Sequence, residues 1–330
     1  MTEPKFEGND VELVEKLSSK IKEIKKEIAK VIVGQDEVID DLLVSLFSKG
    51  HALLVGVPGL AKTLLIKTIS EVFELEFNRI QFTPDLMPSD ITGTEIIEED
   101  AVSGKRSFRF IKGPIFANII LADEINRTPP KTQAALLEAM QEHKITAGGV
   151  NYTLDEPFFV LATQNPIEQE GTYPLPEAQL DRFMFSLWLD YPSFEEEIQI
   201  VKSTTGDYLP ELKKIVDGKE IIEYQDLIRR VPVAENVIEF AINMVKQTRP
   251  NSGGNEEVKE LISWGAGPRA SQYLTLAAKT RAALEGRFTP NIDDVKKSLL
   301  PVLRHRVIPS FNAEADGIDS VAIINMISGE

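Results

Sequence analysis

The chain has 330 residues, of which 42% are hydrophobic, so it can bury a sizeable core and is long enough for two domains. Its 52 Asp and Glu residues outnumber 36 Lys and Arg residues, and the net charge of −16 disfavours a scaffold that wraps nucleic acid phosphates. The lack of cysteine excludes disulfides, thiolate catalysis and Cys-ligated metal; without an apolar leader or membrane-spanning run, we expect a cytoplasmic protein with no membrane insertion.

The first predicted element is an amphipathic helix between Asp10 and Lys30. Its apolar residues recur at alternating steps of three and four, namely Val14, Leu17, Ile21, Ile24 and Ile28. We expect this N-terminal segment, residues 1–30, to pack on the body of its own chain. An intermolecular coiled coil is the alternative, and it is disfavoured because only a few heptads are sustained.

Residues 31–191 alternate short apolar runs with helical patterns. The predicted strands are His51–Val55, Phe77–Phe82, Ile119–Ala122, Phe158–Ala162 and Phe183–Leu189, and helices are predicted at Ala61–Val72 and Lys131–Gln141. Such alternation predicts an αβα sandwich, in which helices cover both faces of a parallel sheet.

Strand signals stop after Pro192, and residues 192–330 are expected to form a smaller all-α domain. The predicted helices are Glu195–Ser203, Tyr224–Arg229, Ala234–Lys246, Glu256–Ile262, Pro268–Glu285 and Ile292–Leu303.

The strongest chemical motif is the octapeptide GVPGLAKT at residues 56–63, between the first strand and a helix, which has the pattern of a P-loop. Lys62 would reach the β and γ oxygens of ATP, and the hydroxyl of Thr63 would ligate Mg²⁺. Ala61 stands where the general pattern has glycine; alanine is tolerable there with helical backbone angles, whereas a left-handed conformation penalises it. A plain turn between strand and helix is the alternative. The predicted nucleotide contacts of this region are Gly56, Pro58, Gly59, Leu60, Ala61, Lys62, Thr63 and Leu64.

A second motif is the apolar run Ile119–Ala122 that ends in adjacent carboxylates. Asp123 would hold Mg²⁺, and Glu124 would orient and deprotonate the water that attacks the γ-phosphate. Alone, this pair would be read as an ordinary acidic helix cap. Because it follows a P-loop at a plausible strand-helix-strand spacing, we interpret it as the carboxylate pair of an ATPase.

Three further residues complete the predicted site. Asn165 follows a strand and would polarise the lytic water; a turn residue before Pro166 is the alternative. Arg182 lies between the end of a helix and the strand predicted at Phe183–Leu189, and by itself would be read as the ion-pair partner of Asp181 or Glu177. Arg269 follows the proline of a first helical turn and would direct a cation from the second domain at the phosphates.

In this order the motifs GVPGLAKT, LADEINR, ATQNP, EGTYPLPEAQLDRF and GAGPRA resemble the MoxR family of AAA+ ATPases, from about Val31 to Arg306. In that family alanine is common at the position of Ala61. The resemblance implies Lys62 and Thr63 as Walker A, Asp123 and Glu124 as Walker B, Asn165 as sensor 1, Arg182 as arginine finger, Arg269 as sensor 2, and Val33 and Gly34 as adenine contacts. Arg127 belongs to the pattern without an assigned role.

Two insertions typical of that clade are also predicted. Residues 94–111 have the pattern of two strands around Asp100–Gly104 and resemble the helix-2 insert. Lys144–Ala147 and Val150–Thr153 flank a Gly-Gly turn, which favours a hairpin and resembles the pre-sensor-1 hairpin. Both would face the pore or a ring surface and engage a partner, with passive surface hairpins as the alternative.

His51, His143 and His305 share no metal-ligand spacing, and surface or capping roles are expected. Trp264 is expected to be a packing anchor of the second domain. The resemblance implies an ATP- and Mg²⁺-dependent motor, assembled as a homo-oligomeric hexameric ring, that remodels or activates protein partners with a von Willebrand factor A domain. The alternatives are a nucleic-acid motor or loader on the same fold, which the negative charge disfavours, and a switch that hardly turns over.

Overall fold

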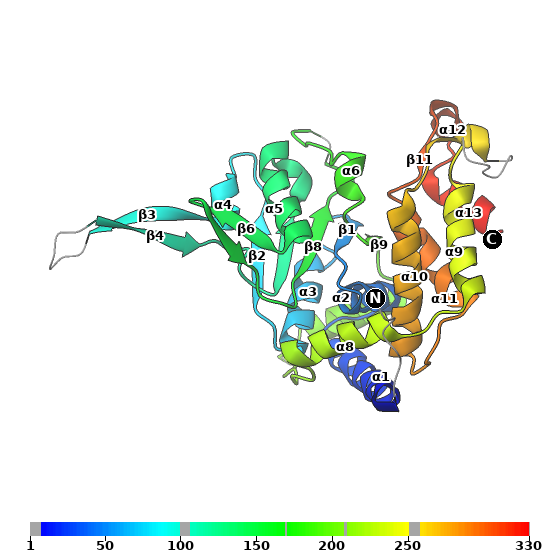
Figure 1. Cartoon of the computed structure of the whole chain (residues 1–330), viewed down its shortest axis with the longest axis horizontal. Helices are drawn as coiled ribbons and strands as arrows, with labels where there is room; N and C mark the ends of the chain where they lie inside the picture. Colours follow the sequence, from blue (N-terminus) through cyan, green and yellow to red (C-terminus); the bar gives the residue numbers. More distant parts are fainter. Residues whose placement is uncertain (1–7, 100–105, 169, 208–209, 251–257, 330) are drawn as a thin grey trace.

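The computed structural model describes residues 8–99, 106–168, 170–207, 210–250 and 258–329. A sheet flanked by helices forms one body, and a group of helices from the C-terminal third lies beside it (Figure 1). A long two-stranded arm projects on the side away from that helical group. The predicted turn at Asp100–Gly104 lies outside the described residues.

Five parallel strands form the central sheet, as predicted. They are β1 (Ala52–Gly56), β2 (Phe77–Gln81), β5 (Ile119–Asp123), β8 (Phe159–Gln164) and β9 (Phe185–Leu189), in the order β2-β5-β8-β1-β9. Every residue of β1 and β5 is buried, which explains why these strands are continuous apolar runs rather than alternating ones. Because the strands are parallel, the loops that carry the predicted chemistry leave the same edge of the sheet.

Each face of the sheet packs into its own hydrophobic core. Leu54 of β1 points to the core shared with α1 (Gly8–Ile28), α2 (Asp36–Phe47) and α3 (Lys62–Val72). Leu53 and Val55 point to the opposite core, which α4 (Pro88–Thr92) and α5 (Pro130–Glu142) help to cover. This alternation follows from the two-residue period of a strand and confirms the αβα sandwich.

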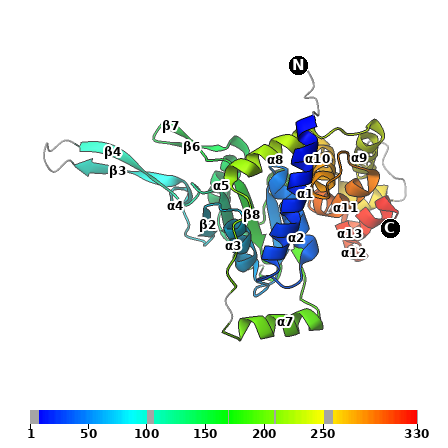
Figure 2. The same cartoon turned by 90° about the horizontal axis from the view of Figure 1, so that it is seen from below.

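The N-terminal helix α1 packs within its own chain, as predicted. Its five periodic apolar residues are at most 3% exposed, and the helix contacts α3, α8 (Gly218–Arg230) and α10 (Pro268–Leu284) (Figure 2). It therefore touches both the sandwich and the helical group. The division at residues 30 and 191 stays a prediction.

Both predicted hairpins are present. The arm consists of β3 (Gly93–Glu99) paired antiparallel with β4 (Arg106–Lys112), and β6 (Lys144–Ala147) pairs with β7 (Val150–Thr153). The ring of Phe110 in the arm stacks on Tyr152 of the second hairpin, with centroids 4.3 Å apart. Ile97 and Phe108 are paired across the arm and are 63% and 75% exposed.

The C-terminal domain is a helical lid. After α6 (Glu177–Leu180) and β9, the chain forms α7 (Phe194–Thr204), α8, α9 (Glu235–Gln247), α10, α11 (Ile292–Leu303), α12 (Phe311–Ala315) and α13 (Ser320–Ser328). None of the residues of α7 is buried, and the helix stands apart from the other helices in Figure 2. Among the described residues, no helix combines the length and apolar character needed to cross a bilayer.

The helix predicted at Glu256–Ile262 is wrong where the structure describes it, from residue 258 onward. A single 3₁₀ turn, Lys259–Leu261, leads into strand β10 (Ile262–Trp264), which pairs with β11 (Ile308–Pro309). Gly265 ends this strand where a side chain would collide with the backbone carbonyl of Thr248, 2.1 Å from the Cβ position. The pairing partner lies more than 40 residues along the chain, so local periodicity did not reveal it.

The roles predicted for two side chains need correction. Trp264 is 68% exposed rather than anchored, because the register of the β10–β11 pair shifts between Ile262 and Trp264 and breaks the alternation of buried and exposed side chains. His51 is buried, not a surface or capping residue: its Nε2 donates to the carbonyl of Met140 at 3.1 Å, and its Nδ1 accepts from the amide of Val160 at 3.1 Å. His143 does end α5, in a left-handed conformation.

Candidate functional site

The P-loop connects β1 to α3 at the carboxyl edge of the sheet. Gly56 leaves room for the neighbouring strand, since a Cβ there would lie 2.9 Å from the Cβ of Leu189. Gly59 has a φ of +89°, which favours glycine. Lys62 begins α3, and its ammonium donates to the Gly56 carbonyl at 2.6 Å.

Lys62 lies in the field of the two predicted carboxylates. Burial lowers the pKa of its ammonium, while the charges of Asp123 and Glu124 oppose that effect. The lysine and the carboxylate pair therefore occupy one electrostatic site, although they lie about 60 residues apart in the sequence.

Ala61 adopts a conformation that the sequence analysis treated as unfavourable for it. Its φ of 53° and ψ of 25° lie in the left-handed region, so the structure has the second of the two conformations considered for Ala61, the one that penalises alanine. The loop has to turn from strand to helix within a few residues. The carbonyl of Ala61 already accepts the first hydrogen bond of the helix, from the amide of Leu65 at 2.9 Å. The methyl group costs on the order of 1–2 kcal/mol in this conformation.

Asp123 ends β5 and is 7% exposed. Thr163 of β8 donates from its hydroxyl to Asp123 Oδ1 at 2.6 Å, and Arg79 of β2 donates to Oδ2 through Nε at 3.1 Å and Nη2 at 2.6 Å. The same Thr163 hydroxyl accepts the backbone amide of Glu124 at 2.8 Å. Thr163 thus orients both members of the carboxylate pair.

The Glu124 side chain is held from two sides. Gln81 at the end of β2 donates its Nε2 to Glu124 Oε2 at 3.0 Å, and Arg127 Nε lies 3.2 Å from the same oxygen. Arg127 also forms an ion pair with Glu168. These contacts give Arg127, which had no role in the sequence analysis, a place next to the predicted base.

Asn165 follows β8 at the same edge and is 5% exposed. Its Oδ1 accepts the amide of Ile167 at 3.1 Å, so the turn role considered as an alternative is real. Its Nδ2 is buried and has no hydrogen-bond partner in the part of the chain that the structure describes. A buried donor of this kind requires an acceptor, which a water molecule or a phosphate oxygen would supply.

The predicted adenine contacts lie beside the first turn of α7. Gly34 has a φ of +71°, and a Cβ there would lie 2.2 Å from Oε1 of Glu196. Gln35 donates its Nε2 to the carbonyl of Asp190 at 3.1 Å. Val33 is half-buried. The adenine assignment of Val33 and Gly34 stays a prediction.

The two remaining predicted arginines lie together at the junction with the lid. Arg269 donates to Asp181 Oδ2 at 2.8 Å, and Arg306 donates to Asp181 Oδ1 at 2.7 Å. Asp181 is thus occupied, and the pairing of Arg182 with Asp181 that the sequence left open is wrong. No hydrogen bond or ion pair among the described residues links Arg182 or Arg269 to residues 56–64 of the same chain.

Three residues of this site were missed by the sequence analysis: Arg79, Gln81 and Thr163. Each is a polar residue within the last three positions of a strand of the central sheet, which is a usable signal. Their roles depend on which strands are neighbours, and that order is a property of the folded sheet.

The parallel sheet, the P-loop at the end of β1, the carboxylate pair at the end of β5 and the helical lid define a nucleotide-binding protein of the AAA+ class. Residues 51–185 match the family described as "ATPase family associated with various cellular activities (AAA)", and residues 255–327 match "AAA lid domain".

Comparison with similar proteins shows which family of AAA+ ATPases the chain belongs to. Chaperone MoxR1 of Mycobacterium tuberculosis is 44% identical over 302 residues, which cover 91% of this chain and 79% of that protein. YeaC of Bacillus subtilis is 40% identical over 301 residues, covering 91% and 90%. The crystal structure of a candidate ATPase from Cytophaga hutchinsonii superposes with a TM-score of 0.89 at 44% identity and covers 96% of both chains. The chain belongs to the MoxR family of AAA+ ATPases, and the resemblance found in its motifs is confirmed.

Proposed function

We propose that this chain hydrolyses ATP in a homo-oligomeric, hexameric ring and uses the energy to remodel or activate a protein partner. The observation that carries the proposal is the convergence of Lys62, Asp123, Glu124 and Asn165 at one edge of the sheet, where the Nδ2 of Asn165 has no partner among the described residues. A phosphate-binding lysine, a metal-binding carboxylate, a base and a water-orienting amide are the groups that phosphoryl transfer to water requires.

Each residue would contribute one part of the reaction. Lys62 would leave the Gly56 carbonyl and bind the β and γ oxygens of ATP. Glu124, fixed by Gln81 and Arg127, would accept the proton of the attacking water, and Asn165 Nδ2 would donate to that water.

The oxygen ligands for Mg²⁺ would be the Thr63 hydroxyl and the Asp123 carboxylate, a donor set that suits this cation together with phosphate oxygens. Asp123 fits the role because it is held in place by Thr163 and Arg79 before any ligand binds. Bound Mg²⁺ would neutralise charge that develops on the phosphates.

Hydrolysis would take place between subunits. The guanidinium of Arg182 has no hydrogen bond or ion pair within the described residues, and it lies with Arg269 at the lid junction, away from contacts with its own P-loop. We propose that Arg182 acts as an arginine finger on ATP bound by the next subunit, and that Arg269 belongs to the same surface. A ring then follows, because each subunit lacks a finger for its own site.

A protein partner is favoured over nucleic acid because the net charge is −16. The relative MoxR1 is named a chaperone, which agrees with a remodelling role. We propose a partner with a von Willebrand factor A domain, bound through the exposed arm β3–β4 and the hairpin β6–β7.

The test is a Glu124→Gln variant, which keeps the size of the side chain but removes its basicity. We expect ATP to remain bound and the assembled form to accumulate, so that a pull-down with this variant retains the partner. Hydrolysis at the parental rate would show that Glu124 is not the base. If DNA or RNA stimulates phosphate release by the parental protein, the proposed function becomes that of a nucleic-acid motor rather than a protein remodeller.

A further inference from the structure

The backbone around Arg182 is held by the lid. Residues 181–184 connect α6 to β9, and each of their four successive carbonyls accepts a hydrogen bond from a lid residue. Asp181 O accepts from Arg306 Nη2 at 2.9 Å, Arg182 O from the Tyr273 hydroxyl at 3.4 Å, Phe183 O from Arg306 Nη2 at 2.7 Å and His305 Nε2 at 3.1 Å, and Met184 O from Arg306 Nη1 at 3.3 Å.

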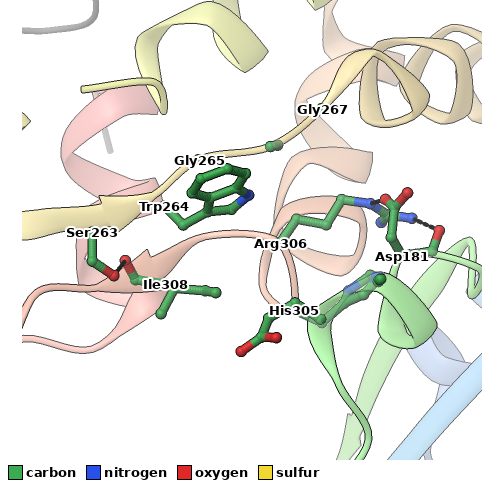
Figure 3. Close-up of a pocket in the computed structure, with 11 residues that line it drawn as sticks. Asp181, Ser263, Trp264, Gly265, Gly267, His305, Arg306 and Ile308 are labelled. Carbon is green, nitrogen blue, oxygen red and sulfur yellow. Dashed lines mark hydrogen bonds and ion pairs between the residues drawn. The ribbon is translucent and has the colours of Figure 1, made fainter. Parts of the chain in front are cut away.

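Arg306 is the centre of this arrangement. It follows α11, is 5% exposed, and reaches from the lid to Asp181 beside a cavity of about 640 Å³ (Figure 3). All five of its N–H donors are used: Nε on Asp181 Oδ1, Nη1 on the carbonyls of Met184 and Val302, and Nη2 on those of Asp181 and Phe183. Full use of its donors allows a guanidinium to be buried here.

The side chain of Arg182 contrasts with its backbone. Its carbonyl and those on both sides are bonded to the lid, whereas its guanidinium has no bond to any residue that the structure describes. Asp181, the nearest carboxylate in sequence, is occupied by Arg306 and Arg269. The segment therefore has a fixed main chain and a cation with no bonded partner among the described residues.

We propose that Arg306 is a positioning residue for the arginine finger. Through it, the lid of one subunit sets where Arg182 is presented to the ATP of the next subunit, so the lid of each subunit controls hydrolysis by its neighbour. The inference rests on the proposed action of Arg182 between subunits. It adds a residue outside the Walker and sensor motifs, and a structural route from the lid to the neighbouring site.

A structural role alone would make Arg306 one of several links between lid and core. The chain offers a matched control for that role. Arg281 of α10 forms an ion pair with Asp41 of α2, with side chains 11% and 16% exposed, and its bonds do not involve residues 181–184. Arg281→Ala should weaken the attachment of the lid without disturbing the finger.

The test uses full-length rings of Arg306→Lys, in which a charge remains but the planar five-donor fork is lost. We expect unchanged ATP affinity and assembly, and kcat lowered on the order of 10²-fold, as for a catalytic group displaced by about 1 Å. Mixed rings of Arg306→Lys and Lys62→Ala subunits should regain activity. Arg306→Lys subunits keep an intact P-loop, and Lys62→Ala subunits keep a correctly positioned finger. Mixed rings with Arg182→Ala should stay inactive, because neither subunit supplies a finger. Arg281→Ala should keep the parental kcat.

The inference would be overturned if Arg306→Lys rings had the parental kcat. It would also be overturned if Lys62→Ala subunits did not restore the lost activity in rings shown to be mixed. Arg182→Ala separates this failure from failure of the proposed function: turnover by that variant would remove the finger itself. If Arg306→Lys does not fold, Tyr273→Phe and Asp181→Asn take its place. The inference then requires lower kcat at unchanged ATP affinity in both variants, and parental kcat in either one overturns it.

Discussion

The bridge that Thr163 makes between the two carboxylate residues can be tested by removing a single hydroxyl. Thr163→Val keeps the shape of a side chain that is fully buried, but loses the bond to Asp123 Oδ1 at 2.6 Å and the bond from the Glu124 amide at 2.8 Å. A bond to a charged carboxylate contributes about 1.5–3 kcal/mol, and a neutral one about 0.5–1.5 kcal/mol. The free energy of unfolding should therefore fall by about 2–4.5 kcal/mol.

The effect on catalysis should be separate from this loss of stability. Without the bridge, Asp123 keeps only its bonds from Arg79, and the Glu124 backbone is free to shift. A displacement of about 1 Å costs on the order of 10²-fold in rate, so kcat should drop by that factor. Urea unfolding and steady-state phosphate release with Mg²⁺-ATP measure the two effects.

Thr163→Ser is the matched control, because it retains the hydroxyl and loses only a methyl group. It should keep most of the parental kcat. Parental turnover in Thr163→Val, or an equal loss of turnover in the serine variant, would refute the idea that this hydroxyl orients the carboxylate pair.

Three other predictions follow from the site and the core. Arg182→Ala and Lys62→Ala rings should each lose turnover, and mixed rings should regain part of it; an inactive mixture in rings proven to be mixed would make Arg182 a residue without a role between subunits. Ala61→Gly should leave the free energy of unfolding unchanged or raise it by up to about 1 kcal/mol, since relief of left-handed strain outweighs the added freedom of the unfolded chain; urea unfolding that shows a clear loss would contradict the backbone geometry. Burial lowers the pKa of His51 from 6.5 to about 4, so the unfolded state takes up a proton at a higher pH than the native state does. The free energy of unfolding should therefore fall by up to about 3 kcal/mol as the pH drops from above 6.5 to below 4.

The pH prediction needs a comparison, because other groups also titrate in this range. Burial raises the pKa of Asp41 to about 6, and Glu156 raises the pKa of His143, and both shifts act in the opposite direction to His51. His51→Phe removes one titration and leaves the others. The loss of stability on acidification should be smaller in this variant than in the parent, and equal losses in urea unfolding would show that His51 is not responsible.

Much of the nucleotide site could be predicted from the sequence because its motifs are local. A strand, a glycine-containing loop and a helix follow one another within residues 52–72, and the carboxylate pair follows directly on a buried strand. The hairpins were predictable for the same reason, since a Gly-Gly turn between two short strands brings neighbours in the sequence together. Apolar runs also identified strands buried on both faces, whatever their order in the sheet.

The tertiary structure decided which of these local pieces meet. Strand order placed Gln81 of β2 next to Glu124, and Thr163 of β8 next to Asp123, across about 40 residues of chain. The left-handed angles of Ala61 come from the geometry that joins β1 to α3, and composition does not specify them.

The pairing of the arginines was decided in the same way. Arg182 follows Asp181 in the sequence. In the folded chain, however, the Asp181 carboxylate accepts hydrogen bonds from Arg306 and Arg269 of the lid, about 90 to 125 residues away. The two adjacent residues differ because the lid supplies donors to the Asp181 carboxylate, whereas the Arg182 guanidinium has no hydrogen bond or ion pair among the residues that the structure describes. Local patterns thus determined the elements and most of the chemical groups of this protein. Contacts between distant elements decided which groups are held, which are left unpaired and which surface they face, because those contacts exist only after the lid has packed against the sheet.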